Sequence, residues 1–180
     1  SQVMLAVDEQ ESQWLPSQNA SLWQRHLKLA LLLPSGSQLV LGPKQGSNAS
    51  HRLLHRITCG IYDAIGSIQL HFKDGVDTGA FGSSTGQQLK CSLEVPEDEV
   101  ITGIRIRHSK AHAAIQNITF DTDLGTEIEF NGKKSDGVQH EFLLEPGELI
   151  VGVYGCCWSE SQPEVVGLGF VVWTPNTTSN

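Results

Sequence analysis

The chain has 180 residues, and 39% of them are hydrophobic, which is enough for one domain with a buried core. Its 12 basic and 20 acidic side chains give a formal net charge of -8, which argues against nucleic acids and anionic membrane surfaces as partners. No apolar run is long enough to span a bilayer, and no basic stretch followed by an apolar one marks a signal peptide at the N-terminus, so neither is expected.

The N-terminal part, residues 1–36, is expected to be an arm or linker that can include one extra strand. Residues 1–25 are polar, and residues 26–33 then place leucine at every second position, which predicts a strand, although leucine also favours helix. Pro34-Ser35-Gly36-Ser37 has the composition of a turn, and residues 38–41 follow as the return strand.

From about residue 53 onward, short apolar segments alternate with turns rich in Gly, Asp, Asn and Ser. No helical periodicity lies between them, so the pattern predicts an all-β sandwich, barrel or prism. The predicted strands are Leu53–Cys59, Gly66–Phe72, Gln88–Val95, Val100–Arg107, Ile115–Asp121, Glu127–Phe130, His140–Leu144, Leu149–Tyr154 and Val165–Trp173.

The sequence contains an internal repeat. Residues 64–72, which begin Ala-Ile-Gly-Ser-Ile, have counterparts at 114–120 and 165–170, each with an apolar pair followed by alternation into Phe or Leu. An apolar-x-Gly element precedes the last two of them, at 101–104 and 150–153, and a looser copy precedes the first. Three related hairpins predict a threefold architecture, and hairpin loops of unequal length are the expected place for recognition.

Four segments resemble the jacalin-related lectins over residues 37–173. They are Gln38-Leu39-Val40-Leu41-Gly42-Pro43, Ala64-Ile65-Gly66-Ser67-Ile68, residues 145–155 from Glu-Pro-Gly to Gly155, and Val165-Val166-Gly167-Leu168-Gly169-Phe170. The resemblance implies a β-prism I domain of three Greek-key four-stranded sheets with pseudo-threefold symmetry, followed by a tail at 174–180. It also implies non-catalytic, metal-free binding of mannose- or galactose-type sugars on glycans or glycoproteins. Assembly as a homo-oligomer or as a module of a larger protein is left open.

The sugar site of that family combines a Gly-rich loop with a G-x-x-x-D motif in the last hairpin. Here Glu164 takes the place of the Asp, Glu160 takes the place of the Gly, and the Gly-rich loop is reduced to Gly42 and Gly46. A carboxylate can accept hydrogen bonds from adjacent hydroxyls, and Trp158 either covers the apolar face of a sugar or caps the prism end. The expected carbohydrate-binding residues are Gly46, His108, Gly155, Trp158, Ser159, Glu160 and Glu164.

The departure from G-x-x-x-D favours an alternative, a β-prism that docks to a protein or a membrane and has lost sugar binding. His108 and His112 lie in the second hairpin loop, which borders the site in the family. This loop offers no third ligand of matching type, so we expect no metal or cofactor and interpret these two residues chiefly as surface histidines.

Two segments resemble enzyme motifs. Asp77-Thr78-Gly79 copies the signature of aspartic proteases, which requires two carboxylates that share a proton and hence a dimer around Asp77. Residues 82–86 fit G-x-S-x-G, but a nucleophile elbow needs a strand before it and a helix after it. The simpler interpretation of residues 73–87 is a long, flexible loop between strands.

The four cysteines are Cys59, Cys91, Cys156 and Cys157, and they form no C-x-x-C pair. We expect most of them to be buried free thiols, and a Cys59–Cys91 bridge is left open. Four N-x-[ST] sequons, at Asn19, Asn48, Asn117 and Asn176, favour a secreted glycoprotein, while a cytoplasmic location stays open.

Overall fold

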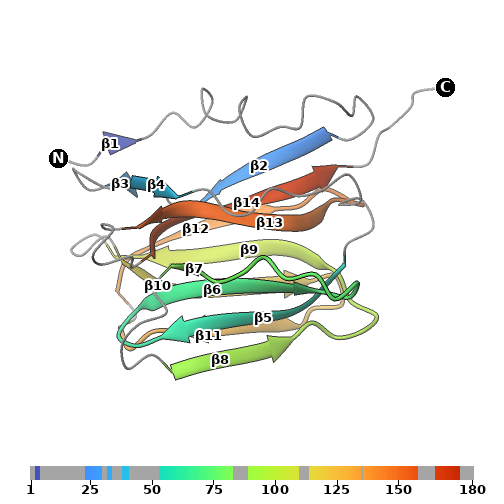
Figure 1. Cartoon of the computed structure of the whole chain (residues 1–180), viewed down its shortest axis with the longest axis horizontal. Coiled ribbons are helices and arrows are strands. Elements are labelled where there is room, and N and C mark those ends of the chain that lie inside the picture. The colour runs from blue at the N-terminus through green and yellow to red at the C-terminus, as the bar shows by residue number, and fades with distance from the viewer. Residues whose placement is uncertain are drawn as a thin grey trace.

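A computed structural model describes residues 53–82, 89–109, 114–134, 136–157 and 165–174, together with four short N-terminal segments that form strands. The fold is built from strands alone (Figure 1). They are β1 (Val3–Met4), β2 (Trp23–Leu29), β3 (Leu32–Leu33), β4 (Gln38–Val40), β5 (Leu54–Ile61), β6 (Ile65–Phe72), β7 (Phe81–Gly82), β8 (Leu89–Glu94), β9 (Ile101–His108), β10 (Ile115–Thr122), β11 (Glu127–Asn131), β12 (Val138–Leu143), β13 (Leu149–Cys157) and β14 (Val165–Thr174). Among the described residues, none belongs to a helix that could cross a membrane.

Three antiparallel four-stranded sheets form the prism, in the orders β7-β6-β5-β8, β11-β10-β9-β12 and β2-β14-β13-β4. Each of the first two sheets is formed by four strands that are consecutive in the chain. The third of the four lies beside the second, and the fourth returns beside the first, which is a Greek key. In the third sheet, hairpin β13–β14 takes both outer strands, β2 and β4, from residues before position 41. The all-β prism expected from the sequence is therefore confirmed.

The three central hairpins share one irregularity. Each begins with a pair, Ile61–Ile65, His108–Ile115 or Cys157–Val165, after which one residue bulges out before regular pairing resumes. The first residue of the return strand is thus position 65, 115 or 165, a constant spacing along the chain. A bulge at the same place in every hairpin is the structural basis of the internal repeat, because bulges bend and twist a strand in a defined way.

The core lies where the three sheets face one another. The strands β6 and β10 are buried along almost their whole length, and the largest fully buried side chains include Phe72, Phe120, Phe130 and Phe170. The Phe120 ring packs edge to face on Phe130 and on Phe170, with centroids 6.5 Å and 5.8 Å apart. In the outer strand β11, buried and exposed residues alternate, which marks its inner and outer faces.

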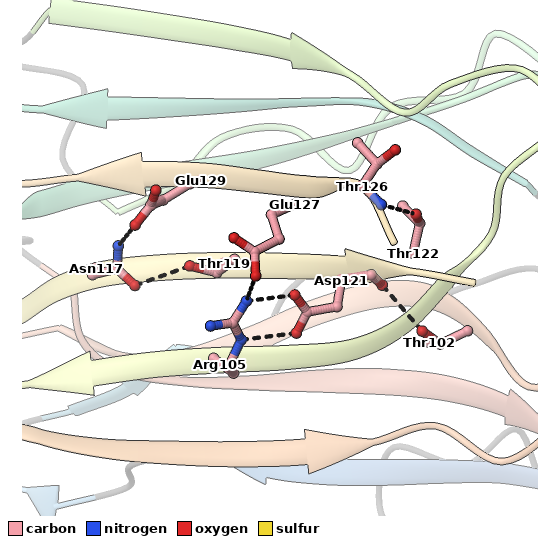
Figure 2. A network of polar contacts seen from close by, with 9 residues as sticks. All are labelled: Thr102, Arg105, Asn117, Thr119, Asp121, Thr122, Thr126, Glu127 and Glu129. Carbon is pink, nitrogen blue, oxygen red and sulfur yellow. Dashed lines mark hydrogen bonds and ion pairs between the residues drawn. The ribbon is translucent and has the colours of Figure 1, made fainter. Parts of the chain in front are cut away.

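A polar network covers part of the outer face of the β11-β10-β9-β12 sheet (Figure 2). Arg105 on β9 donates through Nε and Nη2 to the two carboxylate oxygens of Asp121 on β10, at 2.8 and 2.5 Å, and through Nη2 to Glu127 on β11, at 2.6 Å. Nearby, the Asn117 amide donates to Glu129 and Asn131. Hydrogen bonds thus join the outward-facing side chains of three adjacent strands.

The structure corrects the interpretation of residues 73–87 as a flexible loop for the part it describes. Phe72 N donates to Val76 O, Asp77 forms a bridge with His71, and β7 pairs with β6 at Ser67 and Ile68. The segment is therefore a turn and a returning edge strand. No strand was predicted here because β7 has only two residues and contains a glycine.

All nine strands predicted after residue 53 are present, with ends that differ by a few residues. The strand expected at 26–33 is split into β2 and β3, and β2 pairs along its length with β14. The N-terminal part therefore contributes an outer strand to the third sheet. The division of the chain at residues 36 and 173 stays a prediction.

Candidate carbohydrate-binding site

The three central hairpins have the ends that lead into their turns at one end of the prism. The arrowheads of β5, β9 and β13 point to this end, toward the left in Figure 1. At this end Ile61 pairs with Ile65, His108 with Ile115, and Cys157 with Val165. The strands β8 and β12 begin at the same end, because Leu89 pairs with Ile61 and Val138 pairs with His108. Strand ends from all three sheets therefore lie at the end of the prism where the sequence predicts recognition.

Gly155 occupies a central position in the third sheet near this end. It pairs with Val40 of β4 on one side and with Leu168 of β14 on the other. The next two residues, Cys156 and Cys157, continue both pairings to the start of the last hairpin turn. The β4 strand, which precedes the expected Gly-rich loop in the chain, thus lies directly beside the strand that leads into the predicted sugar-binding loop.

The remaining residues of the expected site divide into two groups. Gly46, Trp158, Ser159, Glu160 and Glu164 lie outside the described residues, as does His112. Their role stays a prediction, although the described strands bring the ends of the last hairpin turn and β4 together. Only Gly155 and His108 have a described position.

His108 is buried, with 2% of its surface exposed, so its interpretation as a surface histidine is wrong. It is the last residue of β9 and pairs with Ile115 on one side and Val138 on the other. Gly137, with a φ of 128°, approaches so closely that a Cβ there would collide with the His108 carbonyl group. The sequence could not show this, because the strands and the glycine that lie against His108 come from later in the chain.

Sequence reasoning missed one segment at this end. Gly82, the last residue of β7, has a φ of 104°, and a Cβ placed on it would collide with the Gly66 carbonyl oxygen and lie 2.5 Å from Val165 Cγ2. Val165 is the first residue after the predicted sugar-binding loop. The positive φ of Gly82 and the close approach of its neighbours require glycine at this position. The only signal of this in the sequence was Gly82 itself, the first residue of the G-x-S-x-G string.

An ion pair fixes another part of the same end. Lys133 Nζ lies 2.7 Å from Asp63 Oδ1, and the Lys133 backbone N–H donates to the Asp63 carbonyl oxygen at 3.0 Å. The hydrogen bond from Lys133, and then its charge, lower the pKa of the Asp63 carboxyl group. The loop after β11 is thereby attached to the turn between β5 and β6, across the boundary between two sheets.

The aspartic protease motif has a structural role in the sheet. Asp77 Oδ1 lies 2.9 Å from His71 Nδ1, at the distance of an ion pair but without the alignment of a hydrogen bond. Thr78 Oγ1 accepts a hydrogen bond from Leu70 N, and the Thr78 backbone N–H donates to Leu70 O. These contacts attach the segment to the end of β6. Among the described residues, no group of three or more His, Cys, Asp or Glu side chains could hold a metal ion.

One of the four sequons lies within the described residues. Asn117 is in the middle of β10, and both hydrogen bonds of its amide nitrogen go to side chains of β11. Thr119, the third residue of the sequon, is buried and donates to Asn117 Oδ1. The Asn117 side-chain nitrogen, to which a glycan would be attached, thus already donates hydrogen bonds in the folded sheet. Secretion and glycosylation stay predictions.

Solved structures with the same fold are lectins. The crystal structure of a prostate-specific WGA16 glycoprotein lectin matches with a TM-score of 0.60 at 20% identity, covering 81% of this chain and 97% of that one. A mannose-specific jacalin-related lectin from Morus nigra, in complex with mannose, matches with a TM-score of 0.58 at 17% identity over 89% and 99%. A mannose binding jacalin related lectin from Ananas comosus matches with a TM-score of 0.60 at 19% identity over 87% and 100%.

A search of the curated proteins gave no match. The family model described as the jacalin-like lectin domain matches residues 40–170, which is well over half of the chain. This range begins at the end of β4 and closes within β14, so it includes the turns of all three central hairpins. The chain belongs to the jacalin-like lectin domain family.

Proposed function

We propose that this chain binds a sugar, without a metal ion, through the loops at the end of the prism where the turns after β5, β9 and β13 meet. The observation that carries the proposal is the convergence of β4 and β14 on β13 at Gly155, directly before the last hairpin turn. Family membership supports it, because jacalin-like lectins are carbohydrate-binding proteins without catalytic activity. The hypothesis of a dimeric aspartic protease around Asp77 is therefore set aside.

In the proposed site, Glu160 and Glu164 accept hydrogen bonds from adjacent sugar hydroxyls, and backbone N–H groups near Gly46 and Gly155 donate to sugar oxygens. Hydrogen bonds to a carboxylate are stronger than those between neutral groups, so they can offset the loss of hydroxyl hydration. Trp158 covers the apolar face of the ring. Almost none of the His108 surface is exposed, so this residue does not contact the ligand. In the proposed site it stabilises the start of the second hairpin loop.

Mannose-type sugars are the first class to test, because the matching solved structures include lectins described as mannose-specific or mannose binding. Shallow polar sites of this kind bind weakly one at a time, and several sites on one particle raise the apparent affinity. We therefore propose that the chain acts on multivalent glycans or glycoproteins.

A glycan array, run with and without a chelator, tests the proposal. We expect binding that the chelator leaves unchanged and that Glu164→Ala and Trp158→Ala each reduce by at least tenfold. Glu97→Ala is the matched control, since Glu97 lies between β8 and β9, at the end of the prism opposite the candidate loops, and should bind as the parent does. An array without binding, together with specific capture of one protein, would instead support a docking module that has lost sugar recognition.

A further inference from the structure

Cys59 and Cys91 face each other across two neighbouring strands. Cys59 is in β5 and Cys91 is in β8, and the two residues are direct partners in the antiparallel register, with Thr58–Ser92 and Gly60–Lys90 on either side. Partners in such a pair point to the same face of the sheet. Here that face is the inner one, because Cys59 is fully buried in the core and Cys91 packs against it.

The spacing of direct partners suits a disulfide. Opposite residues in antiparallel strands have Cα atoms about 4.5–5.5 Å apart, and Cα atoms joined by a disulfide are usually about 4.4–6.8 Å apart. Both thiols are free in the structure, and their backbone positions are direct partners in the register. Closing the bond requires side-chain rotation and no change of strand register.

We propose that Cys59 and Cys91 form a cross-strand disulfide when the protein meets a disulfide oxidant such as oxidised glutathione. The Cys91 thiolate attacks one sulfur of the oxidant, which forms a mixed disulfide and releases one thiolate. Cys59 then gives up its proton and attacks the Cys91 sulfur, which releases the second thiolate. Two protein thiols are oxidised to one disulfide, and one oxidant disulfide is reduced to two thiols.

The order of these steps follows from the burial of the two residues. Cys59 has no exposed surface, whereas Cys91 is partly exposed, so only Cys91 can be reached by an oxidant from solution. Burial, followed by the nearby Cys91, also raises the pKa of the Cys59 thiol, which keeps it protonated and unreactive toward external reagents. Cys59 therefore reacts only with the sulfur beside it.

The bond would attach an edge strand to the core. β8 pairs with β5 on one side and is the outermost strand of its sheet, where strands open most readily. Its first residue, Leu89, pairs with Ile61 at the prism end that carries the hairpin turns. A disulfide two residues further along β8 would restrain the loop that enters this strand from the same end.

Peptide mapping tests the proposal without ambiguity, because trypsin places the cysteines on three different peptides. Cleavage after Arg56 and Lys73 gives residues 57–73 with Cys59, and cleavage after Lys90 and Arg105 gives residues 91–105 with Cys91. Cys156 and Cys157 stay together on residues 135–180, because no Lys or Arg follows Lys134. After incubation with oxidised glutathione, we expect peptides 57–73 and 91–105 joined, two hydrogens lighter than their sum, and separated by reductant.

The parent protein should also have a higher Tm oxidised than reduced, by several degrees. Cys91→Ser is the control, since this side chain is only partly buried, and it should show neither the joined peptide nor a Tm shift attributable to this pair. Separate alkylation of both peptides after oxidation would overturn the proposal. Linkage of either peptide to residues 135–180 would overturn it as well.

Discussion

The rings of Phe120 and Phe170 meet edge to face at the centre of the prism, with centroids 5.8 Å apart and planes at 87°. The two residues hold the same position in the second and third hairpins, five residues after Ile115 and Val165. Phe120 also packs on Phe130 of β11. One side chain thus joins the return strands of two sheets, and this contact is where the pseudo-threefold arrangement is most directly visible.

Replacing Phe120 with alanine should destabilise the domain strongly. The ring is fully buried, so its loss removes apolar contacts with two sheets and leaves a cavity, which costs about 3–5 kcal/mol in well-packed cores. Urea unfolding followed by tryptophan fluorescence measures the change in the free energy of unfolding. Leu124→Ala is the control, since Leu124 is 70% exposed and should change stability by less than about 0.5 kcal/mol. Equal effects of the two variants would contradict a core centred on Phe120.

Gly82→Ala tests the contact between β7 and the start of β14. The added Cβ meets the Gly66 carbonyl oxygen and Val165 Cγ2, and it adopts a φ that L side chains rarely take, so we expect a loss of at least about 2 kcal/mol. Gly75→Ala is the control. Gly75 also has a positive φ, of 82°, but a Cβ added there has open space around it. It should cost about 1 kcal/mol from backbone strain alone. Thermal unfolding of both variants separates collision from strain.

In sugar titrations, Gly82→Ala should also weaken binding if the loop before Val165 forms the site, whereas Gly75→Ala should leave it unchanged. Equal affinity of both variants at a temperature where they are folded would show that the Gly82–Val165 contact does not support that loop.

Arg105 and Asp121 should show a measurable coupling energy. The bidentate geometry and partial burial of both side chains make this pair stronger than an ordinary surface salt bridge. The hydrogen bond that Arg105 donates to Asp121 is the largest factor that raises the pKa of Arg105, so the guanidinium is charged at any working pH. A double-mutant cycle with Arg105→Met and Asp121→Asn should give about 1 kcal/mol of coupling. A coupling of zero at low salt would contradict the network in Figure 2.

Asp63 gives a prediction on pH. Its pKa is lowered in the folded state by Lys133, so the ion pair contributes stability above the unfolded-state pKa, and this contribution is lost as pH falls through the folded-state pKa. In Lys133→Gln, the pKa of Asp63 should rise toward its ordinary value. Carbon-detected NMR titration of the Asp63 carboxyl group measures this directly. An unchanged pKa would show that Lys133 does not contact Asp63 in solution.

The strands after residue 53 could be predicted from the sequence because short apolar segments alternate with turn residues along the chain. In β9 and β11, the buried residues Ile104, Ile106, Ile128 and Phe130 are separated by more exposed ones, and this pattern is local in the chain. The repeat of similar residues at positions 65, 115 and 165 likewise predicted three hairpins, since each copy carries its own bulge and its own inward-facing residues. Family resemblance then supplied the arrangement of the sheets.

The tertiary structure alone decided which distant segments meet. Nothing local in residues 23–29 and 38–40 indicates that they pair with β14 and β13, and nothing in Asp77 or Gly82 indicates contact with His71 or Val165. His108 illustrates the physical reason: it is buried in a strand that lies between β10 and β12, and its partner Val138 follows it by thirty residues. Periodicity records which side of its own strand a residue occupies, whereas burial and site geometry depend on what the rest of the chain packs against that side.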